Sequence, residues 1–251
     1  MSGQNLKYRK LRQKIQKIIK ENICPFPKAI FMAGGPGSGK STVLKSIGLL
    51  GKIEVINPDD AYEKSLLSAG LPLDRSKTTE RYKKIKKEYL EAVEIGDFET
   101  LEALEPEYLA LKAILSQNMK LFNAARKAAK QRQNELSCQD QNFIIDGTSG
   151  HYKAIVNQVE KLKSLGYDVG MIYIDVPLET SISRNRDRGK KGGRGLLDSE
   201  VEKSWTAVSK NLEPYMQYFG ENLFYVDARE SAFDESIDKI KPEVLNFFFG
   251  K

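Results

Sequence analysis

One segment of the chain combines the residue types that bind phosphate. It reads Gly34-Gly35-Pro36-Gly37-Ser38-Gly39-Lys40-Ser41-Thr42 and fits the pattern G-x-x-x-x-G-K-[ST] at every fixed position. Glycines allow backbone N–H groups to curl around a phosphate, and a helix that begins there adds the positive end of its dipole. An apolar run before the segment and a helical pattern to about Leu50 after it give the strand–loop–helix context that this pattern requires.

This loop predicts a binding site for a nucleoside triphosphate. Lys40 is expected to reach the outer phosphates, and the hydroxyl of Ser41 is expected to bind Mg²⁺. The residues expected to contact the nucleotide are Gly35, Pro36, Gly37, Ser38, Gly39, Lys40, Ser41 and Thr42.

Two neighbouring acids follow the second apolar run, in the segment Asn57-Pro58-Asp59-Asp60. Ligand sites of open α/β sheets gather at the carboxyl ends of the strands. A carboxylate there can accept the proton of an attacking hydroxyl, which makes Asp59 the candidate base. Asp59 and Asp60 are both candidate substrate residues. The alternative is that they cap a helix beginning near Ala61, and Asp60 is the better candidate for that cap.

A third apolar run, Phe143–Ile145, ends in Asp146-Gly147-Thr148. A carboxylate in this position typically holds Mg²⁺ directly or through water, so Asp146 and Ser41 are the candidate metal ligands. Thr148 or Ser149 could hydrogen-bond the substrate or cap the next helix. His151, the only histidine, is more typical of a helix start than of catalysis.

A basic, glycine-rich segment runs from Arg184 to Gly195 and holds four arginines and four glycines. Glycines supply flexibility, and arginine forks can neutralise the charge that builds up as a phosphoryl group is transferred. We therefore expect a closing lid, with Arg184, Arg188 and Arg194 as catalytic candidates. A solvated basic loop is the alternative. The aromatic residues Trp205, Tyr215, Tyr218 and Phe219 are expected to belong to the core.

Five strand-like runs alternate with helical patterns: residues 29–33, 53–56, 142–146, 169–175 and 223–227. The helices between and after them are expected at 152–165, 178–185, 199–219 and 233–248. Alternation of this kind predicts an α/β fold of the P-loop NTPase type, with a five-stranded, mainly parallel sheet covered by helices on both faces. Residues 61–136 are rich in Glu, Lys, Leu and Ala and predict an all-helical insertion of three or more helices, with breaks near Gly70, Gly96 and Pro106.

Charge and composition place limits on the class of protein. The chain has 251 residues, 40 Lys and Arg against 34 Asp and Glu, and only two cysteines, Cys24 and Cys138. Neither cysteine has a partner at metal-ligand spacing, and no apolar run suits a signal peptide or a membrane span. These features predict a cytoplasmic protein without a membrane partner.

The first acid along the chain is Glu21, and seven Lys or Arg residues precede it. Leu11, Ile15, Ile18 and Ile19 recur among them at helical spacing, so residues 1–24 predict a basic amphipathic helix ahead of one domain at 25–251. Packing of this helix on the domain is the first interpretation. Docking to nucleic acid or to an unidentified protein partner is the alternative.

Taken in this order, the motifs resemble those of the zeta-toxin-like kinases, a family similar to nucleoside monophosphate kinases and to the kinase domain of phage polynucleotide kinases. The resemblance covers about residues 28–230, and its most specific parts are Asn57-Pro58-Asp59 and Gly192-Gly193-Arg194. The chain departs from the family in having Asp146 where glutamate is usual and Tyr62 where a basic residue is frequent. A phage or bacterial origin agrees with the resemblance.

The resemblance implies an ATP-dependent kinase with Mg²⁺ that phosphorylates a hydroxyl of a small-molecule, nucleotide or nucleotide-sugar acceptor. It places Asp59 at the position of the base, Lys40 and Ser41 at those of the phosphate and metal ligands, and Arg194 with Arg184 or Arg188 at those of the lid arginines. Two alternatives stay open. One is a kinase of nucleic-acid 5′-hydroxyl ends, and the other is a non-catalytic ATP-binding switch whose residues 61–136 bind a partner.

Overall fold

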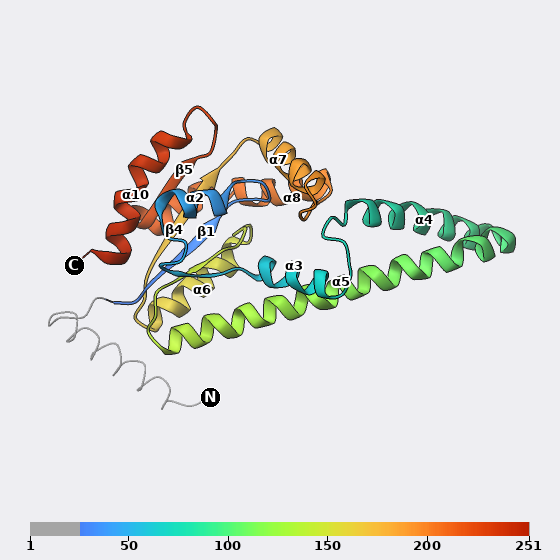
Figure 1. The fold of residues 1–251 in the computed structure, drawn as a ribbon, viewed down its shortest axis with the longest axis horizontal. Coiled ribbons are helices and arrows are strands. Elements are labelled where there is room, and N and C mark those ends of the chain that lie inside the picture. Colours follow the sequence, from blue (N-terminus) through green and yellow to red (C-terminus); the bar gives the residue numbers. More distant parts are fainter. Residues whose placement is uncertain (1–25, 251) are drawn as a thin grey trace. The chain divides into compact units, whose positions relative to one another are not determined.

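The computed structural model describes residues 26–250, so the helix predicted at residues 1–24 lies outside the described residues. The elements in chain order are β1 (Lys28–Ala33), α2 (Lys40–Ile47), β2 (Glu54–Ile56), α3 (Pro58–Ser68), α4 (Ser76–Ile95), α5 (Phe98–Cys138), β3 (Phe143–Ile145), α6 (Tyr152–Ser164), β4 (Asp168–Asp175), α7 (Leu178–Lys190), α8 (Asp198–Ser209), α9 (Leu212–Phe219), the short η1 (Gly220–Asn222), β5 (Leu223–Asp227) and α10 (Phe233–Phe249) (Figure 1).

The described residues fall into two compact units. The first, which we call the sheet unit, comprises the chain up to Asn57 together with residues 130–184 and 199–250. The second, the helical unit, comprises residues 58–129 and 185–198. Helix α7 contributes its residues up to Arg184 to the sheet unit and the remainder to the helical unit. The predicted division into residues 1–24 and 25–251 stays a prediction.

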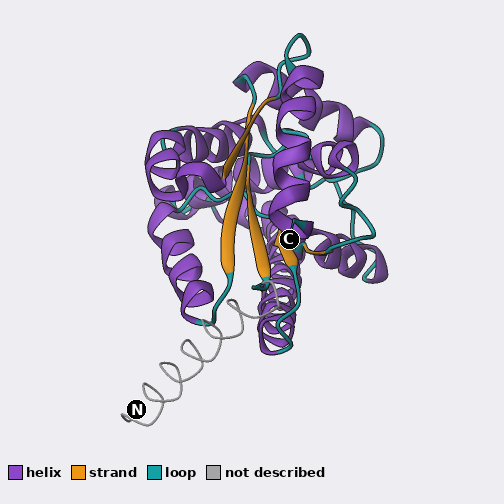
Figure 2. Ribbon diagram, turned by 90° about the vertical axis from the view of Figure 1, so that its left-hand side faces the viewer, coloured by secondary structure: helices purple, strands orange, loops and turns teal. Residues whose placement is uncertain are grey.

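The sheet unit contains one five-stranded sheet in the order β2-β3-β1-β4-β5, and every neighbouring pair is parallel. The predicted α/β fold is confirmed, with all strands parallel. In the register, Ile145 of β3 lies opposite both Phe31 of β1 and Ile56 of β2. The carboxyl ends of these three strands therefore meet at the same edge of the sheet. Helices cover both faces (Figure 2).

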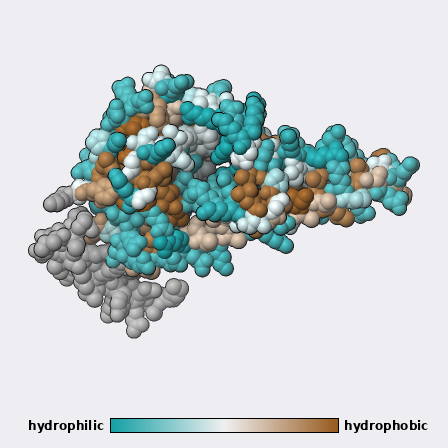
Figure 3. Space-filling view, viewed as in Figure 1, coloured by the Kyte–Doolittle hydropathy of each residue, from teal (hydrophilic) through white to brown (hydrophobic). Residues whose placement is uncertain are grey.

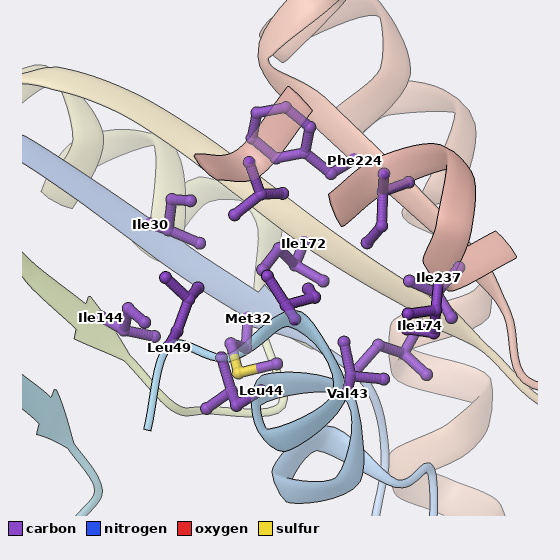
Figure 4. Close-up of a cluster of buried hydrophobic side chains, with 14 of the residues drawn as sticks. Ile30, Met32, Val43, Leu44, Leu49, Ile144, Ile172, Ile174, Phe224 and Ile237 are labelled. Atoms are coloured by element: carbon purple, nitrogen blue, oxygen red, sulfur yellow. The ribbon is translucent and has the colours of Figure 1, made fainter. Parts of the chain in front are cut away.

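On one face, α2 and α10 bury a continuous core against β1, β4 and β5. Val43 and Leu44 of α2 contact this core together with Ile30 and Met32 of β1 (Figure 4). Since β1 and β4 are buried on both faces, their sequences are continuous apolar runs rather than alternating ones. On the opposite face, the Tyr173 hydroxyl of β4 donates to the carbonyl of Val208 in α8 at 3.1 Å.

One predicted helix start and one predicted helix end are wrong. Helix α3 begins at Pro58 rather than near Ala61, because proline suits the first helical position and acids suit the first turn. Asp60 therefore lies inside the first turn and does not precede it as a cap. Helix α7 continues to Lys190 instead of stopping at Asn185, so Arg188 lies on the same helix as Arg184 rather than in a loop.

The break predicted at Pro106 is also wrong, since α5 runs through this residue. The segment just beyond it is fixed to α4 by side chains. Arg81 forms an ion pair with Glu107 at 2.6 Å, and the Tyr108 ring stacks on Tyr89 with centroids 4.6 Å apart. These contacts hold the helix in place where proline removes one backbone donor.

The single helix predicted at 199–219 is two helices, α8 and α9, separated at Lys210 and Asn211. Asn211 is buried, and its side-chain amide donates to the carbonyls of Ala207 at 2.8 Å and Gly150 at 2.9 Å. Tyr215 of α9 is fully buried, and its hydroxyl donates to the Ser149 carbonyl. The expectation that Tyr215 belongs to the core is confirmed.

The helical unit has a small core of its own around Tyr62 and Leu66 of α3 and Ala125 of α5. Helices α4 and α5 form an antiparallel hairpin whose turn uses Gly96 at a φ of 72°. Large apolar side chains are exposed near that turn, among them Ile95 and Phe98, and Figure 3 shows hydrophobic residues scattered along this hairpin.

None of the helices in residues 26–250 is both long and apolar enough to cross a membrane.

We expect Asn211→Ala to lower the free energy of unfolding by about 1–3 kcal/mol, because two half-buried carbonyls lose the donor that the buried Asn211 side chain supplies. Denaturation followed by the fluorescence of Trp205, the only tryptophan, measures this in the sheet unit. Asn157→Ala, at an exposed position on α6, is the control and should change stability by less than about 0.5 kcal/mol. Equal stability of the two variants would contradict the role of Asn211.

Candidate active site

The phosphate-binding loop lies between β1 and α2 in the sheet unit. The Gly34 N–H donates to the Thr148 carbonyl at 3.2 Å, which ties the start of the loop to the segment after β3. Gly39 stands at the N-cap of α2 in the left-handed region, with a φ of 91°, and no side chain caps the helix. A helix N-terminus without a side-chain cap attracts an anion, which fits the phosphates of a nucleotide.

Close packing against α7 shapes the middle of this loop. Gly37 has a φ of 77°, and a Cβ added there would lie 2.4 Å from the backbone oxygen of Ser181. The Ser181 hydroxyl donates to the Pro36 carbonyl. No sequence motif signals Ser181, because its role comes from the position of α7 beside the loop. Trp205 of α8 packs beside Gly35 and donates its indole N–H to the Val176 carbonyl at 2.7 Å.

Lys40, Asp146 and Asn57 form a polar cluster at the carboxyl edge of the sheet. The Lys40 ammonium donates to the carbonyls of Gly34 at 3.0 Å and Gly35 at 3.4 Å, and it lies 3.9 Å from an Asp146 carboxylate oxygen. Asp146 is only 6% exposed, and its other oxygen accepts a hydrogen bond from the Asn57 amide at 3.1 Å. Asn57 thereby orients the carboxylate, a role that sequence reasoning missed.

Ser41 and Thr42 are exposed in the first turn of α2, whereas Ser38 is buried in the loop. The Ser41 hydroxyl and the Asp146 carboxylate are hard oxygen donors, which Mg²⁺ prefers. Their chemistry therefore fits the metal site expected from the sequence.

The segment after Asp146 separates the two hydroxyl candidates. Thr148 is exposed, so its side chain is accessible. Ser149 is buried, and its hydroxyl donates to the Met32 carbonyl at 2.8 Å, which leaves it a structural role. His151 is exposed at the N-cap of α6 and makes no side-chain cap.

Arg184 lies in the sheet unit beside the phosphate-binding loop. One of its guanidinium nitrogens is 3.7 Å from the position that a Cβ would take at Gly39. Another donates to the Ala228 carbonyl at 3.4 Å, a weak contact on an exposed side chain. Of the three candidate arginines, Arg184 is the one in the same unit as Lys40.

The helical unit brings Asp59 together with Arg194. The Arg194 guanidinium donates to a carboxylate oxygen of Asp59 at 2.6 Å, and its Nε lies 3.7 Å from a carboxylate oxygen of Glu63. Arg194 is buried, while the side chain of Asp59 is 42% exposed. Asp60 is exposed in the same turn of α3.

Burial affects the two arginines of this unit differently. Burial lowers the pKa of the Arg188 guanidinium, and the positive charge of Arg194 lowers that pKa further. Burial also opposes the charge of Arg194, but the hydrogen bond to Asp59 and the charges of Asp59 and Glu63 raise the pKa of Arg194 above its ordinary value. The charge of Arg194 is therefore better compensated by neighbouring carboxylates than that of Arg188. An added anion would stabilise the charge of Arg188 more.

Tyr62, at the position where the family frequently has a basic residue, is part of the core of the helical unit. It is fully buried, its ring meets Phe122 edge-on at 5.4 Å, and the Arg75 guanidinium lies over it at 5.5 Å from the centroid. Burial raises the pKa of its hydroxyl. Nothing in the sequence around Arg75 signals this contact.

The candidate site residues predicted from the sequence are thus divided between the sheet unit and the helical unit. The sheet unit holds the phosphate-binding loop with Lys40, Ser41, Asp146, Thr148 and Arg184. The helical unit holds Asp59, Asp60, Arg188 and Arg194.

Comparison with protein families gives one match. The family model described as zeta toxin matches residues 74–233, which is more than half of the chain. No curated protein sequence matches the chain.

Several solved structures are similar to this chain, and the first of them shares its fold. A candidate kinase from Chloroflexus aurantiacus has a TM-score of 0.54 at 14% identity, over 89% of this chain and 99% of that one. A chain of the PezAT chromosomal toxin–antitoxin system of Streptococcus pneumoniae has a TM-score of 0.48 at 16% identity, over 100% of this chain and 89% of that one. A chain of the Pnkp1/Rnl/Hen1 RNA repair complex has a TM-score of 0.48 at 20% identity, over 78% of this chain and 48% of that one.

We expect Gly37→Ala to weaken ATP binding by at least about ten-fold, equivalent to about 1.4 kcal/mol. The new methyl group would meet the Ser181 backbone oxygen and displace the loop. Gly51→Ala is a matched control, because Gly51 has the same φ of 77° but no atom within 4 Å of the added Cβ. Titration calorimetry with ATP measures both variants. Equal affinities for the two would show that the contact with Ser181 does not shape the site.

Proposed function

The chain belongs to the zeta toxin family of P-loop kinases, and on that premise we propose that it transfers the γ-phosphate of ATP, with Mg²⁺, to a hydroxyl of a small-molecule, nucleotide or nucleotide-sugar acceptor. Family membership makes the protein a phosphotransferase that uses ATP. The observation that carries the finer proposal is the cluster of Lys40 and Asp146, 3.9 Å apart, beside an uncapped helix N-terminus.

In this proposal the sheet unit holds the phosphates. Backbone N–H groups of the loop and of the first turn of α2 donate to phosphate oxygens, and Lys40 exchanges its contacts with the Gly34 and Gly35 carbonyls for the outer phosphates. Ser41 and Asp146 would hold Mg²⁺, which when bound neutralises charge on the phosphates. Asn57 keeps the Asp146 carboxylate in one orientation.

Asp59 supplies the base. The acceptor oxygen attacks the γ-phosphorus, its proton passes to the Asp59 carboxylate, and the bond to the β-phosphate oxygen breaks to release ADP. Asp59 follows Asn57 by two residues. The distance between their Cα atoms is therefore at most roughly 7 Å. Arg194 holds the Asp59 carboxylate in place.

The arginines stabilise the charge that develops during transfer. Arg184 stands beside the loop and can turn from its weak contact with Ala228 toward a phosphate oxygen. Arg188, whose cation is poorly compensated, gains a partner when a phosphoryl group approaches. Asp60 and Thr148 are the proposed contacts to the acceptor.

The sequence also favours a second candidate, a kinase of nucleic-acid 5′-hydroxyl ends. Seven basic residues and Glu21 give the first 25 residues a charge of +6, which equals the net charge of the whole chain. A nucleic-acid acceptor would bind with strong salt dependence, because phosphate contacts release counterions.

The proposal is tested with γ-labelled ATP, Mg²⁺ and three acceptor pools: nucleotides, nucleotide sugars and 5′-hydroxyl oligonucleotides. Label in the first or second pool supports the main proposal, and label in the third alone supports the alternative. ATP binding without transfer to any pool would favour a non-catalytic switch.

In the same assay we expect Asp59→Asn to reduce transfer by about 10²–10⁴-fold, because the carboxylate that accepts the proton is lost. ATP affinity should be unchanged, because the phosphate-binding loop belongs to the sheet unit. Asp60→Asn makes the same change on the neighbouring, exposed residue and should reduce transfer by only a few-fold. If Asp59→Asn retains normal turnover with the labelled acceptor, Asp59 is not the base.

A further inference from the structure

A cavity of about 780 Å³ in the sheet unit is lined by none of the residues assigned to phosphoryl transfer. One wall is the strand β5, and the other is a face of α10 that includes Ser236, Ile240 and Phe247. Figure 1 shows α10 running beside β5. We call this cavity the β5–α10 groove.

Strand β5 is an edge of the sheet, and its backbone directions follow from one hydrogen bond. The Ala228 N–H donates to the Asp175 carbonyl of β4 at 2.7 Å. Because backbone groups alternate in direction along a strand, Asp227, Tyr225 and Leu223 point theirs away from β4, toward the groove. The Asp227 N–H donates to the Ser236 hydroxyl oxygen at 3.2 Å, and the Leu223 N–H donates to the Gly220 carbonyl.

Tyr225 is therefore left with both its N–H and its C=O at the open edge. In residues 26–250 no strand pairs with this side of β5. An edge with such groups is a template for another strand. The groove beside it offers the space that an added strand needs.

The side chains that line the groove are apolar at its floor and mostly acidic around that floor. Phe224, Ile240 and Phe247 contribute the floor. Carboxylates line it from Glu221, Glu235 and Glu243, and none of these three forms an ion pair with another described residue. Asp227 also lines the groove but is paired with Arg229. A single lysine, Lys239, opposes these charges.

Phe247, which lines the groove, already contacts a lysine from another part of the fold. The Lys28 ammonium lies over the Phe247 ring at 5.2 Å from its centroid, and it also pairs with Asp168. Lysine side chains are thus compatible with this apolar surface, because their stems bury while the ammonium stays near a carboxylate.

We propose that the β5–α10 groove binds an extended segment of a partner protein that carries lysine or arginine at alternate positions and adds to β5 as a sixth strand. Alternate side chains of a strand point to the same side, so the basic ones would face the carboxylates of α10. β5 is five residues long, which corresponds to roughly 17 Å of strand. Main-chain hydrogen bonds would give affinity, and the charges would give selectivity.

The acidic lining argues against the other occupants. A second copy of this chain pairing edge to edge would bring two sets of carboxylates together, which is unfavourable. Nucleic acids and anionic lipids would be repelled for the same reason.

The probe for this site is a fluorescent peptide, acetyl-(Thr-Lys)₄-Thr-amide, with binding to the full chain followed by fluorescence anisotropy. We expect Glu235→Lys with Glu243→Lys to weaken binding by at least about ten-fold, because two attractive contacts become repulsive. The matched control is Glu200→Lys with Glu202→Lys on α8, which makes the same change in net charge at exposed positions outside the groove. It should retain the affinity of the unmodified protein.

Strand addition has a signature that charge attraction lacks. A peptide of the same sequence N-methylated at alternate residues cannot donate to β5, so it should bind at least about ten-fold more weakly. In NMR spectra, the Tyr225 amide should exchange more slowly when the unmodified peptide is bound.

Three outcomes would overturn the proposal. Equal binding to the two double variants would mean unspecific attraction of charge, and equal binding of the N-methylated peptide would exclude strand addition. Displacement of the probe by a synthetic peptide of residues 5–22 at an equal concentration would assign the groove to this chain's own N-terminal segment instead of a partner.

Discussion

The parallel register of β2, β3 and β1 is the constraint on which the phosphate site depends. Ile145 lies opposite Ile56 and Phe31, so the next residues of all three strands emerge at one edge of the sheet. That register places Asp146 where Asn57 can donate to it and where the Lys40 ammonium comes within 3.9 Å. Two further backbone contacts, from Asp146 to Ile56 and from Gly34 to Thr148, fix the segments beyond the strands. A slip of one residue would turn each side chain to the opposite face and dismantle the cluster.

In the proposed reaction, the two units supply different groups. The sheet unit supplies rigid donors for phosphate, because loop and helix are packed against α7 and the core. The helical unit supplies a carboxylate, Asp59, held by a buried arginine, Arg194. Breaking one partner of such an ion pair leaves a buried charge uncompensated, which is more costly than the pair is stabilising. Burial and the charge of Arg194 both lower the pKa of Arg188, so a nearby anion would stabilise its charge.

Much of the sheet was predictable because strands buried on both faces are continuous apolar runs, and the phosphate loop because its glycines, Lys40 and Ser41 are adjacent in sequence. The predicted strand 223–227 matches β5. Helix ends were less predictable. Pro106 and Pro58 carry the same local signal, yet one lies inside α5 and the other begins α3, since contacts with α4 hold α5 together. The roles of Ser181, Asn57 and Arg75 arise from segments distant in sequence and could not be read from spacing.

The central claim is that Asp146, oriented by Asn57 and placed beside Lys40, is a metal ligand at the nucleotide phosphates. The most direct test is ATP affinity measured by calorimetry with Mg²⁺ and with the metal chelated, in the wild-type protein and in Asp146→Asn, which preserves shape. We expect Mg²⁺ to tighten ATP binding in the wild type by roughly ten-fold or more, and we expect this gain to be lost in the variant. An equal gain from Mg²⁺ in both proteins would contradict it.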